Sequence, residues 1–334
     1  MSHPATETVR RSAVPATALQ RLTVDAAKDA AYRHDTYFRE GLWSFERHAR
    51  PERHHDVTFV VLKPDAIAGR RGEQVLGILR ERGWAAVAAT TVRFDPLLTR
   101  EIWRYQFNAA SAQRIAVVDH LLGSGPSLLV LLYDTSSADL PASVRLTAAK
   151  GSAEPRAARE GDLRTRIGRV NGLFNFMHTA DEPADVVREL QLFSYQAGWD
   201  WCRDALRDPA AVLASANPAA SMRALLNQVT TEIPAHDLDL PAALRRLAAG
   251  QDRWSELALD HARVDEVDLW LAELRRTPLP SGTGRWDVLT VLTGWIECNE
   301  PDVAALLDTP LPARWAAITG HRPVDMPRSA RCPS

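Results

Sequence analysis

Four short apolar runs alternate with segments of helical periodicity across the middle of this chain. Apolar runs of this length are typical of strands buried in a sheet, whereas apolar residues spaced three and four apart are typical of helices. The predicted strands are residues 57–62 (VTFVVL), 85–94 (AAVAATTVRF), 127–134 (SLLVLLYD) and 173–177 (LFNFM). The predicted helices are residues 70–84, 96–107, 111–122, 140–150 and 183–193. This order predicts an α/β (α+β) sandwich, a βαββαβ unit with one sheet covered by helices.

The segments on either side of this unit have a different character. Residues 1–55 are polar at first and then rich in aromatic residues, which predicts an N-terminal extension that is partly helical. Residues 56–195 hold the α/β unit. Residues 196–334 carry most of the tryptophans and no comparable strand pattern. Helical periodicity appears there in residues 203–214, 218–231, 254–276 and 284–297, which predicts an all-α C-terminal domain with tryptophans in its core.

Composition excludes several classes of protein. With 334 residues, 46% hydrophobic and 25% charged, the chain has the profile of a soluble globular protein. A net charge of −2 gives no bias toward nucleic acid or membrane, and no run is apolar enough to span a bilayer. Cys202, Cys298 and Cys332 lack metal-type spacing and cannot all pair, so we expect free thiols in a reducing cytoplasm. The start of the chain, MSHPATETVRRSAV, lacks the apolar core of a signal peptide.

Several side chains suit a chemical role, but each of them also has a simpler structural explanation. Lys63 directly follows the first predicted strand, where a lysine either meets a phosphate or closes the strand at the surface. The hydroxyl of Tyr105 either reaches a polar site or belongs to a packing residue. His54 and His55 beside Asp56 suit a metal ion, but a solvated segment leading into the strand is the favoured interpretation.

The segment from Arg145 to Arg169 is strongly basic. It holds seven basic residues against three acidic ones, a local balance of +4 in a chain that is negative overall. Arginine forks suit the oxygens of a phosphate group, although a solvated basic loop explains the composition equally well. The seven are Arg145, Lys150, Arg156, Arg159, Arg164, Arg166 and Arg169.

His178, in the stretch NFMHTADE, is a candidate nucleophile. Glu189 lies eleven residues beyond it, about two turns into the helix predicted at residues 183–193. A histidine nucleophile keeps one ring nitrogen free, and a carboxylate on the other nitrogen fixes the tautomer and stabilises the charge that develops. The alternative is an ordinary histidine at the end of a strand.

Three stretches together resemble nucleoside diphosphate kinases: TFVVLKPDAIAGRRGEQVLGILRERGW, SGPSLLVLLYD and LRTRIG…NFMHTADEPADVVREL, within residues 56–194. The resemblance implies a ferredoxin-like fold and a ping-pong transfer of phosphate through His178. ATP or another nucleoside triphosphate would be the donor, and Mg²⁺ would arrive bound to the nucleotide, since no dedicated metal-ligand cluster is visible. The family commonly forms homo-oligomers through this domain. The resemblance implies that the phosphates are bound by Lys63, Tyr105, Arg145, Ser152, Arg164 and Asn175, with Glu189 supporting His178.

The chain departs from the family's pattern beside the nucleophile and at the base site. The family has His-Gly-Ser-Asp, where this chain has His178 followed by Thr179, Ala180 and Asp181. The family stacks the base on a phenylalanine between two helices, whereas residues 108–123 contain no aromatic residue. We therefore expect lower activity, weaker binding of ordinary nucleotides, or a specialised metabolite or modified nucleotide as acceptor.

These features predict a phosphotransferase that moves the γ-phosphate of a nucleoside triphosphate through His178 to a nucleotide or nucleotide-like small molecule. The alternative is a non-catalytic protein that binds a nucleotide and engages a partner through the helical domain. Other chemistry at the same site, such as nucleotidyl transfer, also stays open. The helical domain either caps the phosphate site or mediates oligomerisation, and the sequence does not decide between these roles.

Overall fold

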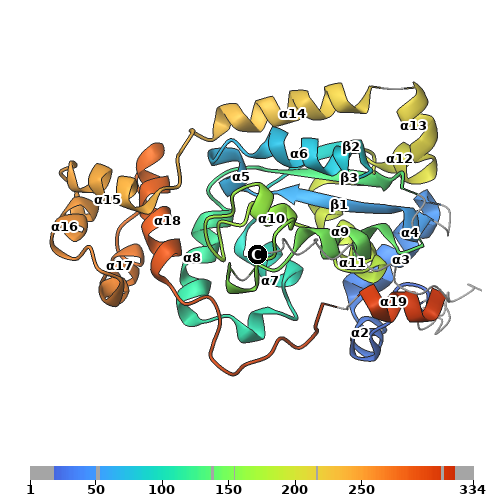
Figure 1. Ribbon diagram of the computed structural model, residues 1–334, viewed down its shortest axis with the longest axis horizontal. Coiled ribbons are helices and arrows are strands. Elements are labelled where there is room, and N and C mark those ends of the chain that lie inside the picture. Colours follow the sequence, from blue (N-terminus) through green and yellow to red (C-terminus); the bar gives the residue numbers. More distant parts are fainter. Residues whose placement is uncertain are drawn as a thin grey trace, which may run out of the picture.

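The computed structural model describes residues 19–49, 53–136, 139–153, 155–215, 217–309 and 312–319. At its centre is an antiparallel sheet with the strand order β2–β3–β1–β4 (Figure 1). Its strands are β1 (Val57–Leu62), β2 (Trp84–Val92), β3 (Ser127–Asp134) and β4 (Met177–His178). The predicted fold class is confirmed. Residues 1–18 of the N-terminal extension, and Cys332, lie outside the described residues.

The fourth strand is shorter than predicted. The sequence predicted residues 173–177, but only Met177 and His178 pair with β1, with His178 opposite Val61. Phe176 adopts φ 71°, and its N–H donates to Asp65 Oδ2 at 2.9 Å. A residue in the left-handed region does not continue a strand. The N–H of Phe176 therefore bonds to the buried Asp65 carboxylate and not to a neighbouring strand. The chain before Met177 is therefore a loop.

Helices cover both faces of this sheet (Figure 1). They are α5 (Pro64–Ala68), α6 (Gly72–Glu81), α7 (Pro96–Ile102), α8 (Ala112–Leu122), α9 (Ala142–Lys150), α10 (Leu163–Arg166) and α11 (Pro183–Ala197). Successive residues of a strand point to opposite faces. Accordingly, Val60 lies in a hydrophobic cluster with α5 and α6, whereas Phe59 lies in another cluster with α7 and α11. Because β1 is buried on both faces, its sequence reads as an almost continuous apolar run.

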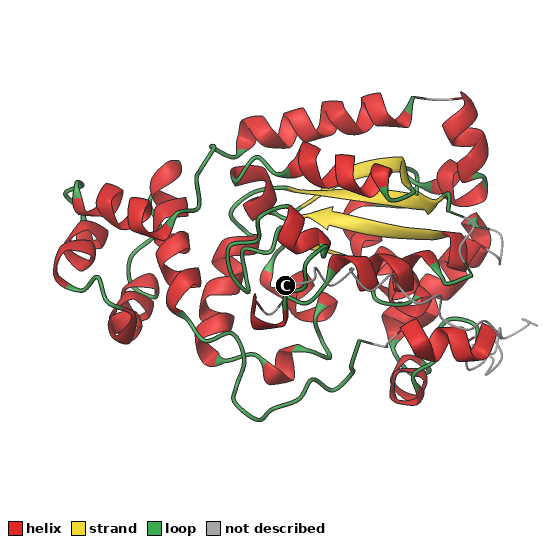
Figure 2. Cartoon of the chain, viewed as in Figure 1, coloured by secondary structure: helices red, strands yellow, loops and turns green. Residues whose placement is uncertain are grey.

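The C-terminal region is helical, as predicted, and shares a core with one face of the sheet. Its helices are α12 (Arg203–Arg207), α13 (Pro209–Ser215), α14 (Pro218–Glu232), α15 (Leu240–Ala248), α16 (Arg253–Asp260), α17 (Val267–Leu274), α18 (Thr283–Trp295) and α19 (Pro312–Thr319). Helix α14 runs beside α6 and the sheet (Figure 2), and its Leu226 belongs to the same hydrophobic cluster as Val60. Trp254, Trp270 and Trp286 are buried in that cluster too. The tryptophans therefore serve packing, as the sequence indicated.

Two predicted C-terminal helices are interrupted. The helix expected at residues 203–214 breaks before Pro209, because proline has no N–H to continue the ladder. The helix expected at residues 254–276 ends at Asp260, and the turn that follows offers the carbonyl of His261 to the indole N–H of Trp270 at 2.9 Å. Helices α15 and α19 were not predicted. No helix within the described ranges is both long and apolar enough to cross a membrane.

The described part of the N-terminal extension forms helices that pack on α11. They are α2 (Ala26–Tyr32), α3 (Thr36–His48) and α4 (Arg53–Asp56). Helix α3 approaches α11 so closely that a Cβ atom at Gly41 would lie 2.5 Å from the carbonyl oxygen of Val187. The ring of His54 stacks on Phe45 at 4.3 Å between centroids. This histidine is therefore buried and has a packing role in α4, whereas the sequence favoured a solvated segment.

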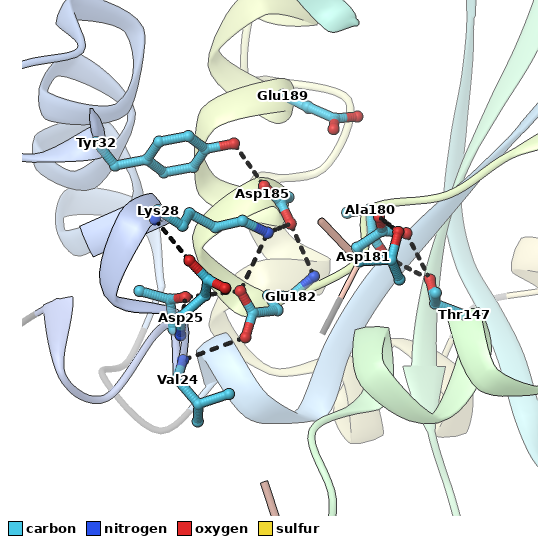
Figure 3. A network of polar contacts seen from close by, with 12 residues as sticks. Val24, Asp25, Lys28, Tyr32, Thr147, Ala180, Asp181, Glu182, Asp185 and Glu189 are labelled. Carbon is cyan, nitrogen blue, oxygen red and sulfur yellow. Dashed lines mark hydrogen bonds and ion pairs between the residues drawn. The ribbon is translucent and has the colours of Figure 1, made fainter. Parts of the chain in front are cut away.

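A buried charge network joins α2 to the start of α11 (Figure 3). Lys28 Nζ lies 2.6 Å from Asp185 Oδ2 and 3.0 Å from Glu182 Oε2, and the hydroxyl of Tyr32 donates to Asp185 Oδ1. These side chains are almost completely excluded from solvent. The two carboxylates outweigh the cost of burial and hold the pKa of Lys28 above its usual range.

Replacing Lys28 by methionine would leave two carboxylates buried without their cation. We expect this change to lower the free energy of unfolding by about 3–5 kcal/mol, the usual cost of removing one partner of a buried ion pair. Urea denaturation followed by circular dichroism measures it. The matched control is Arg33→Met, which removes a half-exposed pair with Asp29 on the same helix and should cost less than about 1 kcal/mol. Equal costs for the two variants would contradict the role of Lys28.

Candidate active site

The imidazole of His178 is held from behind by a carboxylate. His178 ends β4, and its Nε2 lies 2.5 Å from Oε2 of Glu189, two turns into α11. Helix α11 begins at Pro183 and is closed by reciprocal hydrogen bonds between Glu182 and Asp185, a capping box that fixes where the helix starts. Burial raises the pKa of Glu189. Because Nε2 is engaged, Nδ1 is the ring nitrogen available to react.

The loop before His178 is held by its own polar groups. The side chain of Asn171 accepts the N–H groups of Leu173 and Phe174, and the side chain of Asn175 donates to Gly172 O at 2.6 Å. The first strand adds a further support, because the N–H of Lys63 donates to the carbonyl of Phe176 at 3.1 Å. The loop therefore reaches His178 with a defined backbone path.

A cavity of about 130 Å³ lies beside His178. Its walls include three cationic side chains, Lys63, Arg114 and Arg164, together with Asn175. None of the described residues that line it is an aspartate or glutamate. Of the residues singled out from the sequence, the structure thus brings Lys63, Arg164, Asn175 and His178 to one cavity, with Glu189 behind the histidine. Arg114 was not anticipated.

Of the three cations of the cavity, Lys63 and Arg164 are buried and Arg114 is partly buried. Burial lowers the pKa of Lys63 to about 8, and its Nζ donates to the carbonyl of Leu173 at 2.7 Å and lies 3.6 Å from Oδ2 of the buried Asp65. Burial likewise lowers the pKa of Arg164 to about 10, and its Nη atoms donate to backbone carbonyls. The Nε atoms of Arg164 and Arg114 have no hydrogen-bond partner. Buried donors without acceptors are costly, so an anion entering the cavity would relieve the two guanidinium groups.

Arg145 and Tyr105 are not brought to the cavity. The guanidinium of Arg145 donates to both carboxylate oxygens of Asp134 at the end of β3, and lies 3.7 Å from the ring centroid of Trp84. The hydroxyl of Tyr105 donates to Asp35 at 3.1 Å. Both residues find partners close by, and neither lines the cavity. Their predicted part in binding phosphate has no support in this geometry.

Near Ser152, backbone contacts and neighbouring side chains approach the site. The carbonyl of Ser152 accepts from Arg169 at 2.7 Å, and the next residue, Ala153, lines the cavity. One turn earlier, Lys150 Nζ donates to Thr179 Oγ1 at 2.7 Å, directly after the nucleophile. Lys150 belonged to the basic segment of the sequence, but only the fold reveals that it fastens this position.

The unusual residues after His178 fit the backbone they occupy. Among the described residues, those with positive φ that are not glycine are Arg70, Phe176, Leu238 and Asp302. Thr179 is absent from this set, so its backbone does not require glycine. Ala180 is completely buried in the cluster around α11. The His-Thr-Ala-Asp variant is therefore a packed alternative and introduces no backbone strain at Thr179.

Aromatic rings line the cavity, although residues 108–123 contain none. Phe107 lies one residue before that window, and Trp103 lies one turn earlier. The ring of Trp103 meets that of His178 edge to face at 5.0 Å. Phe107 is already covered, because the guanidinium carbons of Arg100 and Arg114 lie 5.4 and 5.3 Å from its centroid. A base would have to displace a guanidinium to stack there.

Within the described ranges, no three His, Cys, Asp or Glu residues form a group suited to a metal ion.

A sequence profile described as nucleoside diphosphate kinase matches residues 56–197. No curated protein matches the chain.

Three solved structures are similar to part of this chain. A nucleoside diphosphate kinase from Aquifex aeolicus is 20% identical over 41% of this chain and 93% of its own, with a TM-score of 0.34. An NDP kinase from Pyrobaculum aerophilum is 16% identical over 41% and 94%, with a TM-score of 0.34. The nucleoside diphosphate kinase from Encephalitozoon cuniculi is 20% identical over 47% and 99%, with a TM-score of 0.37.

The depressed pKa of Lys63 predicts that anion binding takes up a proton. Above a pH of about 8 the lysine of the empty cavity is neutral, and an anion favours its charged form, so affinity should fall as the pH rises. Sulfate is a suitable probe, because it does not titrate in this range. Thermal-shift titration should give a weaker sulfate affinity with each step above pH 8. The Lys63→Gln variant should bind weakly at every pH, and a pH-independent affinity of the unmodified protein would contradict the assignment.

Proposed function

The chain carries a domain of the nucleoside diphosphate kinase family at residues 56–197, and from this premise we propose that it is a phosphotransferase acting through His178. The lone pair on Nδ1 attacks the γ-phosphorus of a nucleoside triphosphate. The bond from that phosphorus to the bridging oxygen breaks, and the nucleoside diphosphate leaves with the electron pair. A terminal phosphate oxygen of an acceptor then attacks the phosphohistidine, which breaks the P–N bond and restores the enzyme.

One observation carries this proposal. His178, with Nε2 bound to Glu189, lines a cavity whose charged residues are all cations. Phosphoryl transfer requires positioning and neutralisation of charge more than covalent assistance from other groups. The Glu189 carboxylate stabilises the positive charge that develops on the imidazole, and Lys63 and Arg164 stabilise the negative charge on the phosphoryl oxygens.

Mg²⁺ would enter with the nucleotide as part of the substrate. The described residues that line the cavity offer N–H donors for phosphate but no carboxylate to hold a metal directly. Mg²⁺ commonly keeps its waters and is held through substrate phosphates, which is consistent with this lining. The acceptor is a nucleotide or a nucleotide-like metabolite that ends in a phosphate group, because the same cations must receive it.

Incubation with γ-labelled ATP and Mg²⁺ should attach label to the protein in an acid-labile, base-stable form. The His178→Ala variant should carry none, since His178 is the only histidine among the described residues that line the cavity. Subsequent addition of nucleoside diphosphates should discharge the label. If nucleotides bind but no triphosphate labels the unmodified protein, the chain is a non-catalytic nucleotide-binding protein.

The Glu189→Gln variant tests the partner of the nucleophile. Glutamine preserves a hydrogen-bond acceptor but removes the charge. A charge-assisted bond is worth about 1.5–3 kcal/mol, so we expect phosphorylation of His178 to slow by about 10- to 100-fold in rapid-quench measurements. The affinity for ATP should change little, because Glu189 does not line the cavity. An unchanged rate of phosphorylation would show that the carboxylate has no part in the transfer.

A further inference from the structure

Residues 296–309 form a strap that leads from α18 toward α19 (Figure 1). The strap runs beside the connection between α7 and α8. The N–H of Ser111 donates to the carbonyl of Cys298, and the N–H of Glu300 donates to the carbonyl of Ala109 at 2.8 Å. At its far end the hydroxyl of Thr309 donates to Asp181 at 2.7 Å, three residues beyond the nucleophile. The C-terminal region therefore reaches into the site.

The strap supplies part of the cavity wall. Cys298 and Asn299 line the cavity together with Arg114 of α8. The side-chain oxygen of Asn299 accepts from Arg114 Nη1 at 3.0 Å. Gly172 on the opposing loop permits this approach, because a Cβ atom there would lie 3.1 Å from the sulfur of Cys298. The position of Arg114 thus depends on a segment nearly two hundred residues away in the sequence.

Arg114 has the properties of an anion receptor. Its guanidinium rests against the ring of Phe107, its Nε has no partner, and its contact with Asn299 is to a neutral oxygen. The charge is therefore oriented but not neutralised. Burial lowers the pKa of Arg114, and Arg114 contributes to the lowered pKa of Lys63, so the two cations act on the same space.

We propose that Arg114, positioned by Asn299, makes this cavity recognise the polyphosphate chain of its ligand in preference to a base. Arg114 binds a phosphate group additional to the one held by Lys63 and Arg164. It also covers Phe107, the ring on which a base would otherwise stack. Asn299 is a positioning residue, whose amide orients the guanidinium without cancelling its charge. This inference deepens the proposed function and rests on it only for the expectation that the ligand carries phosphates.

Isothermal titration with inorganic tripolyphosphate and, separately, with ATP tests the inference without any need for turnover. We expect tripolyphosphate to bind within about tenfold of ATP, because the base adds little. A charge-assisted hydrogen bond corresponds to about a 10- to 100-fold change in affinity, so Arg114→Gln should weaken tripolyphosphate by that factor. The matched control is Arg100→Gln. Arg100 contacts the same ring but pairs with Asp119 and does not line the cavity, so its loss should change the affinity less than twofold.

Substitutions of Asn299 separate positioning from mere packing. Asn299→Asp keeps an acceptor for Arg114 but neutralises it, so the protein should unfold at an unchanged or higher temperature while tripolyphosphate binds at least tenfold more weakly. Asn299→Ala should weaken binding less, because the charge survives. If Asn299→Asp folds and binds tripolyphosphate as the unmodified protein does, the inference is overturned. It is also overturned if tripolyphosphate fails to bind the unmodified protein where ATP binds.

The outcomes distinguish this inference from the proposed function. If binding depends on Arg114 but His178 is not phosphorylated, the proposed kinase activity is wrong and the proposed polyphosphate site stands. If His178 is phosphorylated but substitutions of Arg114 and Asn299 do not change the affinity for tripolyphosphate, the kinase activity stands and the polyphosphate site is wrong.

Discussion

Burial of charge along α11 is the constraint on which the rest of the structure depends. An unpaired buried charge costs several kcal/mol, so each charged residue of this helix requires a partner from elsewhere. Asp185 receives Lys28 from α2, Arg188 donates to Asp35 before α3, and Glu189 receives His178 from β4. Glu182, at the cap, accepts the indole N–H of Trp315 from α19. Segments from both ends of the chain are thereby fixed around the helix that supports the nucleophile.

The sequence predicted the parts of this arrangement that local chemistry determines. Three strands, their helices and the pairing of His178 with Glu189 follow from runs and spacings within a short stretch of chain. The position of Arg145 did not follow, because Asp134 lies within its reach and a nearby carboxylate outweighs a distant phosphate. The left-handed Phe176 did not follow either, since its partner Asp65 lies more than a hundred residues earlier. Contacts between distant segments leave little trace in local periodicity.

The cavity stores an unfavourable arrangement that a ligand can relieve. Lys63 and Arg164 line a cavity that has no aspartate or glutamate among its described lining residues, and burial lowers the pKa of each. Backbone carbonyls orient both cations, and Asp65, buried behind the lining, lies 3.6 Å from Lys63 Nζ. The free-energy cost of burying these cations is therefore offset during folding by the packing of the surrounding hydrophobic clusters. Donors fixed in advance need not reorganise as charge moves to the transferred phosphate, which is how preorganised sites stabilise transition states.

The helical region and the α/β domain share one hydrophobic cluster, and this shared packing holds the strap in place. Backbone hydrogen bonds to the connection between α7 and α8 hold the middle of the strap, and packed helices hold its two ends. Before it, α18 buries Trp286 against the cluster beneath the sheet, and after it, α19 buries Trp315 beside Glu182. Asn299 lies between these two anchors, and its side-chain oxygen accepts from Arg114 at 3.0 Å. Packing of the C-terminal helices thus helps to place the guanidinium of Arg114 in the cavity. The helical region contributes to ligand recognition in this indirect way.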